Sequence, residues 1–353
     1  MRFAAGAVIG DGRLSQNSRR YSERLGVIAD AQFAAATARL GLGALLSAEP
    51  VETGLFGQNV FLTTTAGAFV FRGAPHWHQG RRDDRYQFAK EAFFIGLAHG
   101  ATPAPVPWPC RYDPMSDIFG WPYLVMPRMP GACFNERSIR KALAPGARRE
   151  VAVSLGETLA GLQRLTAPAA GDFDPETGAI APDPGGYAGH LTEWMTSIAR
   201  GADDAGLMTA ADMDWVAALA RTAHGAPPRP VTFVHGDYKL DNMTVAERED
   251  VWCVTGLFDF HTARFGDSAR DLVRAACAWI DTEPELAKVF VESWRARGGD
   301  DAGLAPWLPF YVASERVALW AHFVRADPRP EWSLGLTFRT WAERYIERLA
   351  ALL

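Results

Sequence analysis

The strongest indication of the fold of this 353-residue chain is the stretch His235-Gly-Asp-Tyr-Lys-Leu-Asp-Asn242. It follows residues 231–234, a short apolar run whose composition predicts a β-strand. Asp237 and Asn242 are five positions apart, so a tight loop can direct both side chains into one cleft. A carboxylate there can accept a proton from a hydroxyl group, and an amide oxygen can bind a hard cation. The spacing therefore predicts Asp237 as a catalytic base and Asn242 as a metal ligand.

The same spacing of Asp and Asn occurs in the catalytic loop of protein kinases, His-Arg-Asp-x-x-x-x-Asn. Lys239 stands two positions after the aspartate, where a cation can neutralise phosphate charge, and we predict it as a second catalytic group. Taken alone, the stretch has a competing interpretation as a capped turn with a solvated aspartate.

A second motif, Gly256-Leu-Phe-Asp-Phe-His261, places an aspartate at the end of an apolar strand over residues 251–258. Asp259 comes seventeen positions after Asn242, and a hairpin of that length returns the chain to the same place. Mg²⁺ prefers carboxylate and amide oxygens together with the phosphates of a nucleotide. We therefore predict Asp259 as the second metal ligand; the competing interpretation is an aspartate that caps the next turn.

These motifs, with Gly266-Asp267 and Arg270-Asp271-Leu272 after them, resemble the aminoglycoside phosphotransferase-like and choline kinase-like small-molecule kinases. The resemblance spans roughly residues 30–350. It implies an α+β, two-lobed protein-kinase-like fold with a small β-rich lobe and a larger, mainly helical lobe. The expected division is an N-terminal segment and helix over 1–40, a nucleotide-binding lobe over 41–128 and a catalytic lobe over 129–353.

The N-terminal half carries weaker elements of the same resemblance. Residues 54–59, Gly-Leu-Phe-Gly-Gln-Asn, resemble the loop that covers the nucleotide, and residues 69–72 resemble the strand that carries a phosphate-binding cation. Residues 123–131 resemble the hinge between lobes. The resemblance implies nucleotide contacts from Gly57, Asn59, Arg72, Glu91, Met126 and Arg128, with Glu91 pairing with Arg72. The alternative for Arg72 is an exposed strand arginine.

Three positions and the glycine loop depart from the family pattern. Arg72 replaces the usual protein-kinase lysine, and the glycine loop lacks a full Gly-x-Gly-x-x-Gly. His261 replaces the glycine of Asp-Phe-Gly, and Gln163 stands where many relatives carry a histidine. None of these changes removes a group that the chemistry requires. Asp267 and Asp271 are expected to bond the loop backbone and cap a helix, and His235 to bond the backbone near Asp259.

The composition excludes several other classes of protein. Lys and Arg total 36 against 41 Asp and Glu, so the net charge of -5 excludes a broadly basic nucleic-acid binder. The four scattered cysteines form no Cys-x-x-Cys pair, which argues against a zinc ribbon or a disulfide scaffold. Residues 92–110 lack charge, but four prolines break any membrane-spanning helix there. We expect a cytoplasmic protein without membrane or nucleic-acid partners, and the oligomeric state stays open.

The resulting hypothesis is Mg²⁺-dependent transfer of the γ-phosphate of ATP or GTP to a hydroxyl of a small molecule. The acceptor is an antibiotic (an aminoglycoside or a macrolide) or an endogenous metabolite, and Trp279, Asp281 and Glu283 are candidates for its pocket. Other hypotheses are a nucleotide-binding pseudokinase that acts as an interaction module and a metal-dependent phosphatase. Helical periodicity is predicted over 268–282, 303–325 and 333–352, among other segments, and residues 166–188 are predicted to form a loop.

Overall fold

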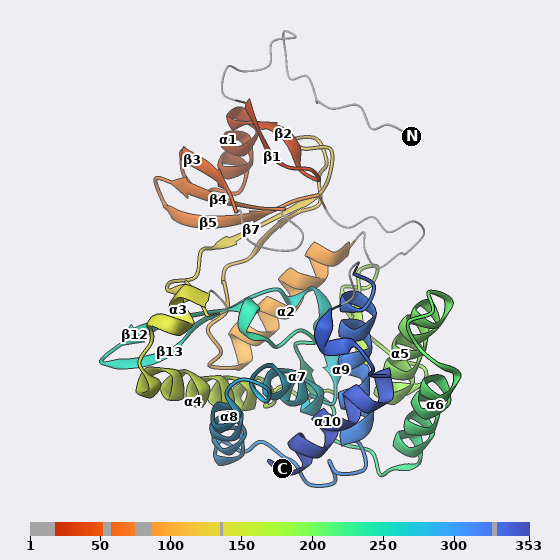
Figure 1. The fold of residues 1–353 in the computed structure, drawn as a ribbon. Helices are drawn as coiled ribbons and strands as arrows, with labels where there is room; N and C mark the ends of the chain where they lie inside the picture. Colours follow the sequence, from red (N-terminus) through yellow and green to blue (C-terminus); the bar gives the residue numbers. More distant parts are fainter. Residues whose placement is uncertain (1–17, 52–57, 75–85, 135–136, 327–329) are drawn as a thin grey trace. The chain divides into compact units, whose positions relative to one another are not determined.

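The computed structural model describes residues 18–51, 58–74, 86–134, 137–326 and 330–353. The chain divides into two compact units (Figure 1). The first unit contains Met1–Gly100 and Val106–Pro130, and the second contains Ala101–Pro105 and Gly131–Leu353. Gly57, which the resemblance assigns to the nucleotide loop, lies outside the described residues.

The first unit is built on a five-stranded antiparallel sheet in the order β3-β4-β5-β7-β6. Its strands are β3 (Leu45–Pro50), β4 (Asn59–Thr64), β5 (Gly67–Arg72), β6 (Arg111–Asp113) and β7 (Tyr123–Pro127). A hairpin of β1 (Ser18–Ser22) and β2 (Gly26–Ala29) precedes helix α1 (Asp30–Arg39). Residues 69–72, which resemble a strand in the sequence, lie in β5.

The two faces of this sheet are covered by different helices, as the alternation along β7 requires. Tyr123 and Val125 point into one cluster with Phe33 of α1. Leu124 and Met126 point into another with Phe88 of α2 (Gln87–Ala101). Because successive side chains of a strand face opposite sides, one apolar strand can serve two cores. The sheet therefore holds α2, and with it Glu91, against the face opposite to α1.

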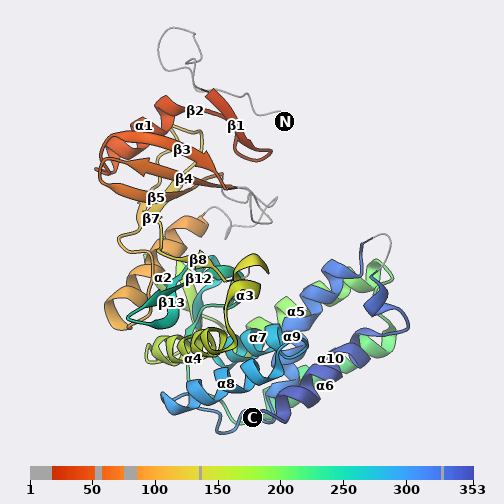
Figure 2. The same ribbon diagram turned by 60° about the vertical axis from the view of Figure 1, so that its left-hand side comes forward.

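The second unit is mainly helical. Its helices are α3 (Arg137–Ala142), α4 (Pro145–Leu162), α5 (Gly186–Asp204), α6 (Ala210–Gly225), α7 (Ala269–Trp279), α8 (Pro284–Ala296), α9 (Leu308–Phe323) and α10 (Phe338–Ala350). Helix α4 packs against α8, and α9 packs against α5, α7 and α10 (Figure 2). Gly156 permits the first of these contacts, since a Cβ there would lie 2.5 Å from the Phe290 carbonyl oxygen.

Two small sheets of the second unit lie on either side of residues 235–242, called here the decisive loop. One has the order β13-β12-β8, from β8 (Ala132–Cys133), β12 (Met243–Arg248) and β13 (Val251–Leu257). The other has the order β10-β9-β14-β11, from β9 (Gly171–Asp174), β10 (Ala179–Pro182), β11 (Thr232–Val234) and β14 (Arg264–Gly266). The loop leaves β11 and enters β12 through a short 3₁₀ turn, Leu240–Asn242, so sheets fix both of its ends.

The prediction of a loop over residues 166–188 is wrong, because β9 and β10 form a hairpin there. The Asp174 carboxylate accepts hydrogen bonds from the Glu176 amide at 3.0 Å and the Thr177 hydroxyl at 3.0 Å, and Gly178 adopts a φ of 68°. These features close the turn, and Gly171 pairs with Phe265 of β14. The polar, glycine-containing sequence thus marks a turn between strands.

Two predicted helices begin later than periodicity suggests. Helix α9 begins at Leu308 instead of residue 303, and α10 begins at Phe338 after a 3₁₀ turn, Glu331–Ser333. Thr337 caps α10, since its hydroxyl accepts a hydrogen bond from the Thr340 amide.

The fold class is α+β, as expected. Within the described part of the chain, every helix is too short or too polar to cross a membrane.

Candidate active site

Three side chains of the second unit contact the carboxylate of Asp237. Asn242 Nδ2 donates to the Asp237 carbonyl oxygen and to its Oδ2, both at 2.9 Å. Lys239 Nζ lies 2.8 Å from Oδ2, and the Arg274 guanidinium contacts Oδ1. The structure therefore brings together three of the residues that the sequence singled out, Asp237, Lys239 and Asn242.

The backbone of the loop is held by a buried aspartate from α7. Asp271 accepts hydrogen bonds from the His235 amide at 2.6 Å and from the Gly236 amide at 3.0 Å. Gly236 has a φ of 79°, and a Cβ there would lie 2.7 Å from the Thr262 carbonyl oxygen. Only glycine combines this backbone conformation with such a close approach. The motif thus needs both its glycine and the distant aspartate.

His235 has a structural place beneath the loop. Its Nε2 lies 3.1 Å from the Phe258 carbonyl oxygen, next to Asp259, and its Nδ1 accepts the Asp237 amide at 3.3 Å. The ring is fully buried, and this burial lowers its pKa from 6.5 to about 4. A neutral ring with its proton on Nε2 satisfies both contacts. The expected bond from His235 to the backbone near Asp259 is confirmed.

Asp259 stands at the end of β13 in a left-handed conformation, with φ 73° and ψ 55°. The Phe258 amide donates to the Asn242 carbonyl oxygen at 3.1 Å, which joins the two motifs through their backbones. His261, the replacement for a family glycine, places Nδ1 2.6 Å from Asp259 Oδ1. His261 thus contacts one of the two carboxylate oxygens of Asp259.

The donor set of Asn242 and Asp259 fits a magnesium ion. Both hydrogen bonds of Asn242 use Nδ2, so its side-chain oxygen faces away from Asp237. Among the described residues, no group of three or more His, Cys, Asp or Glu side chains gathers to hold a metal. An amide and a carboxylate oxygen suit Mg²⁺, which usually keeps waters and takes its remaining ligands from phosphates.

The charge on Asp237 is set by its neighbours. Burial alone would raise the pKa of Asp237, but the positive charges of Arg274 and Lys239 outweigh this effect and hold the pKa below its usual value. The carboxylate is therefore ionised at neutral pH. An ionised oxygen can accept a hydrogen bond, and then a proton, from a hydroxyl group.

Two residues of the site, Arg274 and Glu315, were not predicted from the sequence. Glu315 of α9, which is 1% exposed, contacts Arg274 and lies 2.8 Å from Arg270. Arg270 and Arg274 are four positions apart on α7 and therefore share one face. That spacing could have indicated that Arg274 lies on the same side of the helix as Arg270. Glu315 lies in an apolar helix 41 positions beyond Arg274, where the local sequence gives no sign of the contact.

The first unit holds the residues assigned to the nucleotide phosphates. Arg72 ends β5, opposite Asn59 of β4 in the sheet register. Its Nη1 lies 2.6 Å from Glu91 Oε1 of α2, and the Glu91 side chain is fully buried. The predicted contact between Arg72 and Glu91 is present. The alternative of an exposed strand arginine is wrong, because Arg72 is only 8% exposed.

The hinge residues occupy different environments. Met126 is buried against Phe88 and Leu124, so its side chain belongs to the core. Arg128 is exposed, and its guanidinium carbon lies 3.8 Å above the ring of Phe61. The assignment of Met126 and Arg128 to nucleotide binding therefore stays a prediction.

The expected acceptor residues separate in the structure. Trp279 is fully buried and packs edge to face on Phe290 of α8, so its side chain belongs to the core of the second unit. Glu283 pairs with Arg140 at 2.8 Å and also contacts Arg148, which assigns it to helix packing. Asp281 does line a cavity.

The structural aspartates behave as expected. Asp267 Oδ1 accepts the Ala269 amide at 2.9 Å at the start of α7. Its Oδ2 accepts Arg229 Nε at 2.6 Å and the Tyr311 hydroxyl at 2.7 Å. Gln163, at the family's histidine position, accepts Trp294 Nε1 at 2.9 Å. These contacts stabilise the helices around the loop.

The fold is similar to solved structures of small-molecule kinases. A protein provisionally assigned as an aminoglycoside phosphotransferase from Ralstonia eutropha matches with a TM-score of 0.64 at 16% identity, over 91% of this chain and 98% of that one. The GDP complex of wild-type aminoglycoside 2'-phosphotransferase-IIIa gives 0.57 at 16% identity, over 94% and 98%. A provisionally assigned fructosamine-3-kinase from Haemophilus somnus gives 0.58 at 14% identity, over 90% and 96%. At these identities the similarity establishes the fold.

A sequence relative extends the comparison. Acyl-CoA dehydrogenase family member 11 of Rattus norvegicus is 26% identical over 251 residues. The match covers 69% of this chain but only 30% of the length of that relative. The family model described as "Phosphotransferase enzyme family" matches residues 47–307, which include the decisive loop, Asp259 and the Arg72–Glu91 pair. The chain therefore belongs to the phosphotransferase enzyme family.

Proposed function

We propose that this protein transfers the γ-phosphoryl group of ATP or GTP to a hydroxyl group of a small molecule, with Mg²⁺ as the cofactor. The observation that carries the proposal is the contact set of Asp237, an ionised carboxylate that Asn242 and Lys239 hold in place. Family membership supports small-molecule kinase activity. The GDP complex of a relative with the same fold supports a nucleotide as the donor.

The proposed reaction is a direct displacement at phosphorus. The acceptor oxygen forms a bond to the γ-phosphorus while the bond to the β,γ-bridging oxygen breaks, and the nucleoside diphosphate leaves. Asp237 orients the acceptor hydroxyl and takes its proton. Lys239, whose Nζ lies 2.8 Å from Asp237, holds this carboxylate and carries positive charge next to the transferred group. Positioning and charge neutralisation supply most of the catalysis in phosphoryl transfer.

Asn242 and Asp259 would hold the magnesium ion through one amide and one carboxylate oxygen. When bound, the ion neutralises charge on the phosphates. In the first unit, Arg72 is assigned to the nucleotide phosphates, with Glu91 fixing its direction through the 2.6 Å contact. An arginine keeps its charge at every relevant pH and presents several donors to phosphate oxygens.

The phosphatase and pseudokinase alternatives lose support. In the described part of the chain, no cluster of His and Asp side chains provides the bridging ligands of a two-metal phosphatase. A pseudokinase would lack one of Asp237, Asn242 and Asp259, and all three are present.

The test is a screen of the purified protein with ATP and with GTP. The panel contains aminoglycosides, macrolides, other antibiotics and hydroxylated metabolites, and mass spectrometry detects the phosphorylated acceptor. We expect a phosphomonoester product that disappears in excess EDTA and returns with added Mg²⁺. Asp259→Asn should raise the Mg²⁺ concentration needed for half-maximal rate. Full turnover in EDTA, or nucleotide binding without transfer across the whole panel, would contradict the proposal.

A further inference from the structure

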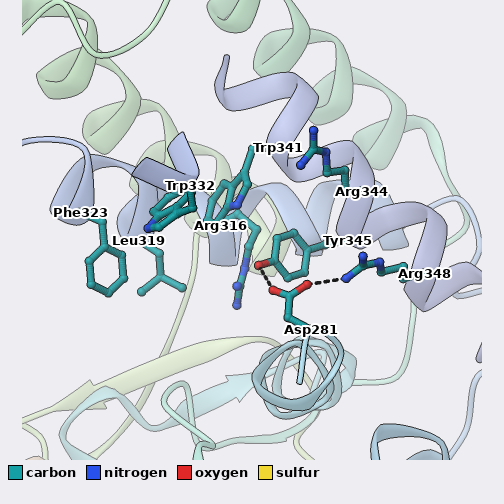
Figure 3. A pocket seen from close by; sticks show the side chains of 9 residues that line it. All are labelled: Asp281, Arg316, Leu319, Phe323, Trp332, Trp341, Arg344, Tyr345 and Arg348. Carbon is teal, nitrogen blue, oxygen red and sulfur yellow. Dashed lines mark hydrogen bonds and ion pairs between the residues drawn. The ribbon is translucent and has the colours of Figure 1, made fainter. Parts of the chain in front are cut away.

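A cavity of about 390 Å³ opens in the second unit between α9, α10 and the end of α7 (Figure 3). One wall is aromatic. Trp332 stacks on Trp341 with ring centroids 5.3 Å apart, and Trp341 meets Tyr345 edge to face at 5.3 Å. Flat apolar walls of this kind accept a planar or apolar part of a small molecule.

The charged groups of the cavity leave an excess of positive charge. Three arginines and one aspartate line it: Arg316, Arg344, Arg348 and Asp281. Asp281 is already neutralised, because its carboxylate accepts the Tyr345 hydroxyl and pairs with Arg348 (Figure 3). Arg316 and Arg344 therefore remain as the two other cations among the residues that line the cavity.

Arg316 is the group that points to a ligand. Its side chain is buried, with 6% of the residue exposed, and it lines the cavity. Within the described residues it makes no hydrogen bond or ion pair, and its Nε is buried without a partner. The guanidinium carbon lies 4.6 Å from the ring centre of Tyr345 and 5.7 Å from that of Trp341. Glu315 attracts Arg316 electrostatically but does not contact its guanidinium. A buried polar group without a direct partner is costly, and an anion in the cavity would supply one.

Side-chain contacts link Asp237 to Glu315, the neighbour of Arg316 on α9. Arg316 follows Glu315, which contacts Arg274, and Arg274 contacts Asp237. Arg274 lies in α7, and Asp281 follows two positions after the last residue of this helix, Trp279. Seven residues in helical conformation span roughly 10 Å. An acceptor that binds in the cavity must therefore be long enough for its hydroxyl to reach Asp237.

We propose that the acceptor is a hydroxylated carboxylate with a flat apolar part, and that Arg316 binds its carboxylate. This inference rests on the proposed function and specifies the acceptor class of the same site. The aromatic side chains contact the apolar part, and Arg344, which also lines the cavity, adds positive charge. A polycationic acceptor such as an aminoglycoside is disfavoured, because it would meet two unneutralised arginines.

Three probes of matched shape test the charge preference: 4-(hydroxymethyl)phenylacetate, its primary amide and 4-(aminomethyl)benzyl alcohol. Isothermal titration calorimetry on the wild-type protein, without nucleotide, should show the carboxylate binding at least tenfold more tightly than the amide. The amine should bind weakest. Equal or tighter binding of the amide or the amine would overturn the inference without any variant.

Variants then assign the preference to Arg316. Arg316→Met should remove the tenfold advantage of the carboxylate, while Arg316→Lys, which keeps the charge, should retain part of it. Arg325→Met, the same change at an exposed position beyond the cavity, should leave it intact. Circular dichroism checks that each variant is folded. A preserved preference in a folded Arg316→Met variant would overturn the assignment.

Transfer is read separately from binding, so the two proposals fail differently. With ATP or GTP and Mg²⁺, phosphorylation of the bound carboxylate probe at its hydroxyl supports both. Phosphorylation of neutral or cationic acceptors in preference to the carboxylate would overturn the acceptor class and leave the kinase function standing. Selective binding of the carboxylate with no transfer to any acceptor would contradict the kinase function itself, and the inference that depends on it.

Discussion

The Arg274 guanidinium contacts the carboxylate of Asp237 with one nitrogen and that of Glu315 with another. Glu315 is buried and also pairs with Arg270, so it holds the Arg274 guanidinium on the side away from Asp237. The direction of the Asp237 side chain and its charge thus depend on a residue outside the loop motif. Arg274 is a positioning residue for the proposed base.

Replacing Arg274 should alter the pH dependence of the reaction. The positive charge of Arg274 lowers the pKa of Asp237, so Arg274→Met should raise that pKa and move the acid limb of kcat/KM to higher pH. We expect about a tenfold loss at neutral pH, equivalent to roughly 1.4 kcal/mol. Arg274→Lys keeps the charge and serves as the control. A pH profile of Arg274→Met that matches the wild type would refute the positioning role.

Removing the charge of Asp271 should disorganise the loop. Asp271→Asn replaces one acceptor of the two backbone amides by an NH₂ group, which faces a second donor. Burial raises the pKa of Asp271 to about 7, so the comparison belongs at pH 8, where the carboxylate is mostly ionised. We expect a loss of about 1–3 kcal/mol in urea unfolding together with a lower kcat.

The control for this change is Asp250→Asn, in the exposed turn between β12 and β13. Asp250 has a φ of 64°, a conformation that asparagine also tolerates. Its unfolding free energy should stay within about 0.5 kcal/mol of the wild type. Equal stability of both variants would show that Asp271 does not support the loop.

His235 should make the protein less stable as the pH falls. Its pKa is about 4 in the folded state against 6.5 ordinarily, so the unfolded chain binds its proton first. The contribution of neutral His235 to the free energy of unfolding is fully present above pH 6.5, declines as the pH falls and is lost near pH 4. This contribution amounts to roughly 3 kcal/mol.

Urea unfolding at pH 7, 5.5 and 4 tests this dependence. His235→Gln should lose less stability over the range than the wild type, by about that amount. The exposed His224, which contacts Thr192, supplies the control, and His224→Gln should follow the wild type. Parallel curves for His235→Gln and the wild type would mean that His235 titrates normally in the folded protein.

The buried Arg72–Glu91 pair should separate stability from nucleotide binding. Arg72→Met leaves Glu91 buried without this partner, and breaking such a pair costs about 3–5 kcal/mol. The double variant Arg72→Met/Glu91→Leu removes both charges and should recover most of the stability. If Arg72 binds phosphate, the double variant should still bind ATP and GTP poorly in calorimetry. Wild-type affinity in the stable double variant would remove Arg72 from the nucleotide site.

Much of the site was predictable because it is local. The loop from His235 to Asn242 has its functional groups within eight residues, and the apolar strand before Asp259 is evident from composition. The contact between Arg72 and Glu91 was accessible through the family resemblance. Its burial was not, because burial depends on how α2 packs on the sheet.

The parts that escaped prediction depend on tertiary packing. Glu315 and Arg316 are neighbours in a helix whose other residues are mostly apolar, and they face different partners. Only the packing of α9 against α7 and α10 shows that one holds Arg274 while the other lines a cavity. The hairpin of β9 and β10 escaped because each strand has only four residues, and β9 pairs with the distant β14.

The most direct test of the central claim compares Asp237→Asn with Asp241→Asn, an exposed aspartate in the same loop. The measurements are the rate of phosphate transfer from Mg-ATP or Mg-GTP to the acceptor that the screen identifies, and the nucleotide Kd. Asp237→Asn should reduce transfer by about 10²–10⁴-fold, because the amide cannot take the proton, and should leave the Kd within about threefold. Asp241→Asn should transfer at nearly the wild-type rate. Near-normal transfer by Asp237→Asn would contradict the assignment of the base, and loss of nucleotide binding would make Asp237 a metal ligand instead.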